Sequence, residues 1–101
     1  MSDRVDAETA EELADRVESG DLRLYELEDH ADADTAAAAR RLIVENHSGA
    51  DLDTTGEYAF PAEKAAGSNI ENMIGAAQIP MGVAGPVTID GGAFEGETYL
   101  P

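Results

Sequence analysis

The chain opens with a helical pattern of apolar residues. Apolar side chains recur every three or four positions, while acidic side chains occupy the remaining surface; the apolar set is Ala10, Leu13, Ala14 and Val17. Asp6 is a candidate N-cap, Thr9 and Glu12 form an alternative capping box, and Gly20 lies where a glycine often ends a helix. This pattern predicts a first helix that ends before Gly20.

The next two segments differ in their periodicity. Residues 22–28 alternate apolar and polar side chains, which predicts a short strand or an extended turn. A second helix is predicted from Asp32 or Asp34 to Asn46, with Gly49 as its stop and an apolar face made of Ala36, Ala39 and Ile43. Because both helices have narrow faces of small residues, they need a partner surface for stability.

The second half of the chain predicts a short helix and a β-hairpin. Residues 68–75 form the predicted helix, entered through Ser68 or Asn69. Val83, Val87 and Ile89 predict a strand that is interrupted at Gly85-Pro86. Residues 90–92 are a turn sequence, and residues 94–100 offer the returning strand. The predicted fold class is therefore α+β.

Composition adds a question about stability. Leu, Ile, Val and Phe supply only 19 of the 101 residues, and the net charge is −16 with a pI near 4.1. Such a ratio lies near the disordered class, so either the chain does not fold by itself or it is adapted to high salt. Regular helical patterns, five Arg against one Lys, and many small residues favour the second reading. In molar salt the Debye length falls to ~3 Å, which screens the repulsion.

Several classes of protein are excluded by the same counts. There is no Cys, and therefore no disulfide framework or thiolate metal site. No apolar run is long enough to span a membrane, and the acidic N-terminus lacks the features of a signal peptide, so we expect a cytoplasmic protein without a membrane anchor. Nucleic acid is not an expected partner, because phosphate binding needs clustered cations.

A shift in composition predicts two parts. Residues 1–64 hold all six cations and 18 of the 22 acids, whereas residues 65–101 are rich in Gly and Pro and hold no cation. We therefore expect a helical domain over 1–64 and the start of a second, larger domain over 65–101. Because a two-stranded hairpin is marginal alone and the last strand stops abruptly at Pro101, the chain is expected to be a fragment.

Candidate metal ligands are weak. Asp51, Asp53 and Thr55 occupy the first oxygen positions of a calcium loop, but position 12 is Ala62 instead of the required Glu. His30 and His47 lack the partners that a zinc site needs. An acidic turn and solvated histidines are the better interpretations, so no metal site is predicted.

One stretch, residues 69–86, is almost free of charge in a highly charged chain. Its apolar residues favour burial against another subunit or the rest of a larger fold. Within it, the sequences Glu71-Asn-Met-Ile-Gly75 and Pro80-Met-Gly-Val-Ala-Gly-Pro86 resemble motifs of the 3-hydroxy-3-methylglutaryl-CoA reductase family. Residues 24–28 and the paired Arg40 and Arg41 are similar to upstream family elements, and residues 99–101 resemble the lead into a further motif.

The resemblance implies an oxidoreductase that uses two NADPH to reduce the CoA thioester to mevalonate, without a metal, in isoprenoid biosynthesis. It also implies a homodimer or a higher homo-oligomer of a soluble, halophilic archaeal type. Tyr25 matches a tyrosine that packs over the CoA adenine, and a dimer-interface motif matches Glu71, Asn72, Met73, Ile74 and Gly75. Met73 and Glu26 stand where the family usually has Val and Lys. The catalytic Glu, Lys, Asp and His are expected beyond Pro101, so the fragment itself is expected to be inactive.

Two alternatives stay open from the residues alone. The first is a complete small acidic protein that folds on a partner through residues 69–86. The second is a calcium-binding module built on Asp51, Asp53 and Thr55.

Overall fold

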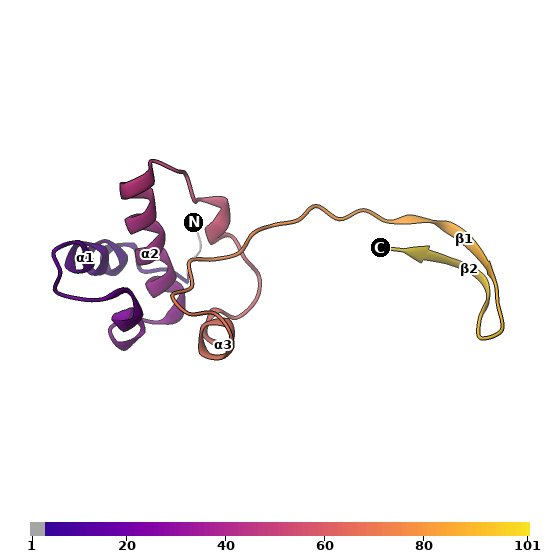
Figure 1. Ribbon diagram of the computed structural model, residues 1–101, viewed down its shortest axis with the longest axis horizontal. Coiled ribbons are helices and arrows are strands. Elements are labelled where there is room, and N and C mark those ends of the chain that lie inside the picture. The colour runs from indigo at the N-terminus through magenta and orange to yellow at the C-terminus, as the bar shows by residue number, and fades with distance from the viewer. Residues whose placement is uncertain (1–3) are drawn as a thin grey trace.

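The computed structural model describes residues 4–101, which form a helical part followed by an extended hairpin (Figure 1). The helical part contains α1 (Ala7–Glu18), the 3₁₀ helix η1 (Leu24–Asp29), α2 (Ala33–Ser48), the short 3₁₀ turn η2 (Thr54–Gly56) and α3 (Ala62–Ser68). The hairpin contains β1 (Ala84–Asp90) and β2 (Glu95–Leu100). The molecule measures 63 × 27 × 22 Å because the hairpin extends away from the helices.

The prediction of α1 is confirmed, including its ends. The Asp6 carboxylate accepts a hydrogen bond from the Thr9 amide at 3.2 Å, so Asp6 is the N-cap and not the Thr9–Glu12 box. Gly20 follows the helix with a φ of 87°, the left-handed conformation that glycine adopts without strain.

The prediction of a strand or extended turn over residues 22–28 is wrong, because η1 forms there. Its turns close locally: the Glu26 amide donates to the Arg23 carbonyl at 3.0 Å, and the Glu26 carboxylate accepts from the Arg23 amide at 3.0 Å. The apolar residues that alternate along this segment include Leu22 and Leu27, which are both buried between the helices. Because these two side chains are five positions apart, a strand would place them on opposite faces, whereas the turn into η1 allows both to be buried in one core.

The second helix is confirmed as α2, with Asp32 as the N-cap and Gly49 at its end. It runs two residues beyond the predicted Asn46. Four consecutive alanines, residues 36–39, are all buried, and their small size allows α1 to pack closely against α2. The main core also includes Leu13, Leu22 and Leu27, with Val17, Leu42 and Ile43 at its edge.

The predicted helix over residues 68–75 is wrong. The third helix lies earlier, from Ala62 to Ser68, directly after Pro61, whose fixed φ suits a helix entry. Residues 69–75 leave the helical conformation, with φ values of 51° at Asn72 and 147° at Gly75. α3 spans the composition boundary, and the division into domains 1–64 and 65–101 stays a prediction.

The hairpin is confirmed. β1 and β2 pair antiparallel, with Val87 opposite Thr98 and Asp90 opposite Glu95, and a bulge separates Ala84 from Val87 as Gly85-Pro86 suggested. Helices followed by an antiparallel hairpin fit the predicted α+β class. Over residues 4–101, no helix combines the length and apolar character that a membrane crossing requires.

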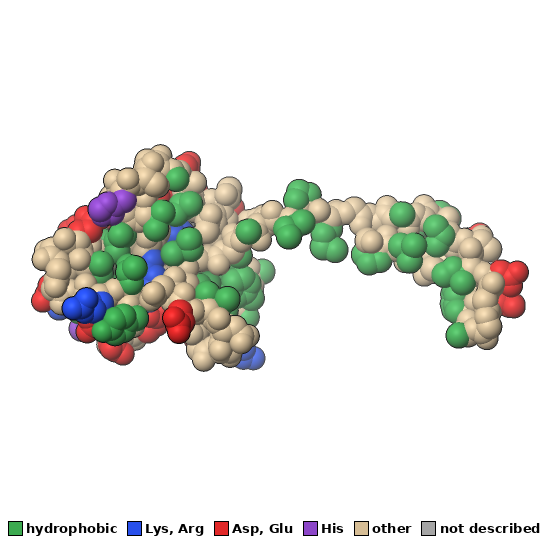
Figure 2. Space-filling model, in the orientation of Figure 1, with side chains coloured by type: hydrophobic (Ala, Val, Ile, Leu, Met, Phe, Trp, Pro, Cys, Tyr) green, Lys and Arg blue, Asp and Glu red, His purple; other side chains and the backbone are tan. Residues whose placement is uncertain are grey.

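The extended segment before the hairpin exposes large apolar side chains (Figure 2). Ile79, Met81 and Val83 are 82%, 81% and 71% exposed, on alternate positions of an extended backbone. Met73, which the sequence grouped with them, is instead buried against Tyr58 and Ala62 in a second, smaller core.

Candidate functional site

Tyr25 lies on η1 with 68% of its surface exposed. Leu27 of the same helix is completely buried in the main core and so anchors η1. η1 therefore presents the Tyr25 ring from a firmly packed base. A flat, exposed aromatic ring of this kind suits stacking against a planar ligand.

Arg40 of α2 also holds η1 in place, through hydrogen bonds and an ion pair. Although only 2% exposed, its guanidinium donates to the Leu24 carbonyl from Nε at 3.0 Å and from Nη2 at 2.7 Å. It also forms an ion pair with Glu28, in which Nη1 donates at 2.8 Å and Nη2 makes a second, shorter bond. The buried charge is thus compensated by a carboxylate and by carbonyls, as burial of an arginine requires.

The ion pair lowers the pKa of Glu28, chiefly through the hydrogen bonds from Arg40. A carboxylate with a depressed pKa stabilises the fold above its ordinary pKa of 4.5 and loses this effect as the pH falls through the lowered value. The contribution of the Glu28–Arg40 pair to the contact between η1 and α2 is therefore lost in acid.

The segment Glu71–Gly75 is held through its backbone. The Met73 carbonyl accepts from Arg40 Nη1 at 3.1 Å, and the Ile74 carbonyl accepts from Arg41 Nη1 at 2.8 Å. Glu71 and Asn72 are exposed. At Gly75 a Cβ would lie 2.0 Å from the Thr55 carbonyl oxygen, so only glycine permits this close approach. Of the five residues in this predicted interface motif, Met73 faces the interior of the chain.

Tyr58 connects the loop before α3 to the start of α2. Its hydroxyl donates to Asp34 at 2.5 Å, its ring stacks on Phe60 at a centroid distance of 4.8 Å, and Arg4 lies 4.6 Å above the ring centre. Burial and the bond to Asp34 raise the pKa of Tyr58 to about 12. This cluster fixes the loop that supports Met73.

We expect the Tyr58 contact to be lost in alkali. A group whose folded pKa is raised contributes its full stability below the ordinary pKa of 10.0, and loses it as the pH rises toward about 12. The wild type should therefore have a larger free energy of unfolding than Tyr58→Phe below pH 10, and this difference should shrink as the pH rises toward about 12. Tyrosinate absorbance checks the assignment: Tyr58→Phe should remove the titration near pH 12, whereas Tyr99→Phe should retain it.

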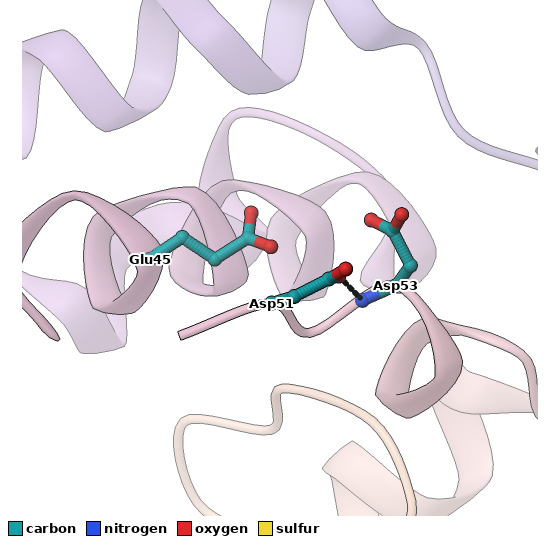
Figure 3. Close-up of side chains that lie close together, drawn as sticks. All are labelled: Glu45, Asp51 and Asp53. Carbon is teal, nitrogen blue, oxygen red and sulfur yellow. Dashed lines mark hydrogen bonds between the residues drawn. The ribbon is translucent and has the colours of Figure 1, made fainter. Parts of the chain in front are cut away.

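Three carboxylates gather where α2 meets the following loop (Figure 3). Oxygen atoms of Glu45, Asp51 and Asp53 lie within 4.8 Å of one another. Glu45 accepts from the Leu52 amide at 2.8 Å and Asp51 accepts from the Asp53 amide at 2.9 Å, so two of these groups act as turn caps. The acidic turn expected from the sequence accounts for these contacts.

The other candidates from the sequence stay apart. His30 and His47 are exposed, and neither belongs to a metal-like group among residues 4–101. Sequence reasoning missed Glu28 and the central place of Arg40. The available signal was an arginine within the alanine-rich face of a helix, because a buried arginine requires partners.

Comparison with known proteins identifies the family. A sequence model of hydroxymethylglutaryl-coenzyme A reductase matches residues 36–101. The chain therefore belongs to the hydroxymethylglutaryl-coenzyme A reductase family, a family of oxidoreductases.

The relatives refine this assignment. The chain is 70% identical to the 3-hydroxy-3-methylglutaryl-coenzyme A reductase of Haloferax volcanii over 92 residues, which are 91% of the chain and 23% of the relative. The chain is 58% identical to the reductase of Halobacterium salinarum, again over 91% of the chain and 23% of the relative. That of Methanothermobacter thermautotrophicus is 40% identical over 88% of the chain and 22% of the relative. The chain thus spans about a quarter of the length of these relatives.

Proposed function

We propose that this chain is part of a 3-hydroxy-3-methylglutaryl-CoA reductase that reduces the CoA ester to mevalonate with NADPH. The supporting observation is the family match over residues 36–101 together with 70% identity to the Haloferax volcanii protein of that name. This match favours the reductase over the small interaction protein and over the calcium module.

In this proposal the chain binds and positions but does not perform the chemistry. Reduction of a thioester to an alcohol requires two hydrides, a cation beside the developing oxyanion and proton donors. The only lysine, Lys64, is exposed on α3 and lies outside the matching motifs. The catalytic groups are therefore assigned to parts of the reductase outside these 101 residues.

The described residues do not fit an NADPH site. Gly82 precedes β1 and Gly85 lies within it, so neither glycine leads into a helix whose N-terminus could hold a pyrophosphate. Arg40, Arg41 and Arg16 have protein partners within the chain, at Glu28, the Ile74 carbonyl and Asp21. We assign NADPH binding to the remainder of the reductase.

The proposed tasks of this chain are two. Tyr25 packs against the CoA adenine, for which its exposed ring on a fixed helix is suited. Glu71–Gly75 lies at the seam between two subunits, for which its exposed Glu71 and Asn72 and its anchored backbone are suited. The exposed Ile79, Met81 and Val83 would be covered in the same assembly.

A chimera tests this function. The present chain replaces the matched 92 residues of the Haloferax volcanii reductase, and NADPH oxidation with the CoA ester is measured in molar KCl. Tyr25→Ala should raise the KM for the CoA ester by at least about fivefold, since stacking on a base contributes ~1–3 kcal/mol. The kcat should change little.

Tyr25→Phe is the matched control, because it keeps the ring and should keep the KM. Equal effects of Ala and Phe would remove the adenine role from Tyr25. Absence of NADPH oxidation by a folded chimera would contradict the proposed reductase function.

A further inference from the structure

The Arg40 side chain joins three segments, its own helix α2, η1 and Glu71–Gly75, with every donor that it has. Its five N–H groups make five hydrogen bonds: two to the Leu24 carbonyl, two to the Glu28 carboxylate and one to the Met73 carbonyl. No buried side-chain nitrogen or oxygen among the described residues lacks a partner. The guanidinium is therefore saturated, and none of the three segments can move without stranding a buried donor.

These segments carry the two tasks proposed above, so the inference rests on the proposed function. Leu24 and Glu28 flank Tyr25 on η1, whereas Met73 is the centre of Glu71–Gly75. The partners lie 16, 12 and 33 residues from Arg40 in the sequence. One rigid, planar side chain thus connects the ligand-facing helix to the seam segment.

We propose that Arg40 is a positioning residue that couples CoA-ester binding at Tyr25 to subunit pairing at Glu71–Gly75. Ligand that favours this position of η1 also favours the position of the guanidinium, and through it that of the Met73 carbonyl. By thermodynamic linkage, pairing of the subunits favours ligand binding by the same factor. An unpaired buried donor is costly, which makes the shared side chain an effective connection.

Arg41 provides a matched comparison on the next position of α2. It donates to the Ile74 carbonyl, and its guanidinium passes close to Gly56, where a Cβ would lie 2.8 Å from Cζ. Its hydrogen bond goes to the seam segment and not to η1. Loss of Arg41 should therefore weaken pairing without removing the coupling.

The test uses the chimera and measures the dimer dissociation constant with and without CoA, the non-reacting ligand. In the wild type, CoA should lower this constant by about fivefold or more, the lower end of usual coupling. Arg40→Lys keeps the charge but has three donors in place of five. The coupling factor, by which CoA lowers the dimer dissociation constant, should therefore fall toward one, and the KM for the CoA ester should rise. Arg41→Lys should raise the dissociation constant yet keep the factor.

Two further variants make every outcome decisive. Glu28→Gln leaves Arg40 in place and should reduce the coupling factor partly. This variant tests the coupling if Arg40→Lys does not fold. Arg16→Lys, at the exposed pair with Asp21, should change nothing. A factor of one in an active wild-type chimera, or an unchanged factor in folded Arg40→Lys, would overturn the coupling alone; a folded but inactive chimera would overturn the proposed function.

Discussion

Replacement of Leu27 by Ala is expected to lower the free energy of unfolding by about 3 kcal/mol, within the range of ~2–5 kcal/mol for buried leucines. Leu27 is completely buried between α1 and α2, in a core otherwise built largely from alanines. Because alanine cores contain few methylene groups, each large side chain carries an unusual share of the buried apolar surface.

The measurement is urea unfolding in molar KCl, followed by circular dichroism. Leu24→Ala is the matched control, since Leu24 belongs to the same helix η1 but is 39% exposed. It leaves the carbonyl that Arg40 binds intact and should cost less than ~1 kcal/mol. Equal losses for the two variants would contradict the core position of Leu27.

The second large effect expected is a dependence of folding on salt. Residues 1–64 carry 18 acids against six cations, and much of α1 outside its apolar stripe is acidic. At an ionic strength near 0.1 M the Debye length is ~10 Å, so these charges repel across the helix surface; in molar KCl it is ~3 Å. The helical circular dichroism signal, to which α1 and α2 contribute most, should therefore increase strongly from about 0.1 M to molar KCl.

A variant with fewer charges tests the cause. Glu11, Glu12 and Asp15 are exposed on α1, and their replacement by the corresponding amides should shift the folding midpoint to lower KCl. Sucrose at equal osmolarity is the control, because it does not screen charge. Spectra that respond equally to sucrose and KCl, or not at all, would contradict the electrostatic explanation. The same experiment tests the adaptation to high salt that the composition predicts.

The wrong predictions share a physical origin. The alternation over residues 22–28 and the helix entry at Ser68 or Asn69 are local patterns, yet both segments take their conformation from distant groups. η1 is set by the burial of Leu22 and Leu27 against other helices. Residues 73–74 are kept out of a helix as their carbonyls accept from Arg40 and Arg41.

The candidate site follows the same division. The motif Glu71–Gly75 and the candidate Tyr25 could be found from the sequence, because a family motif is a contiguous string. The burial of Met73 and the ion pair between Arg40 and Glu28 could not, since they depend on residues brought together by folding. The group of Glu45 with Asp51 and Asp53 was missed for the same reason.

The sequence by itself determined the presence of α1 and α2, the glycines that follow them, the hairpin and the family. Three features depend on atoms a few residues apart: the caps at Asp6 and Asp32, the stops at Gly20 and Gly49, and the hairpin turn at residues 91–94. Local chemistry therefore suffices for them. Only the tertiary structure decided that the Tyr25 helix and the Glu71–Gly75 segment share one guanidinium. Their connection through Arg40 is a matter of packing in space, which no local periodicity encodes.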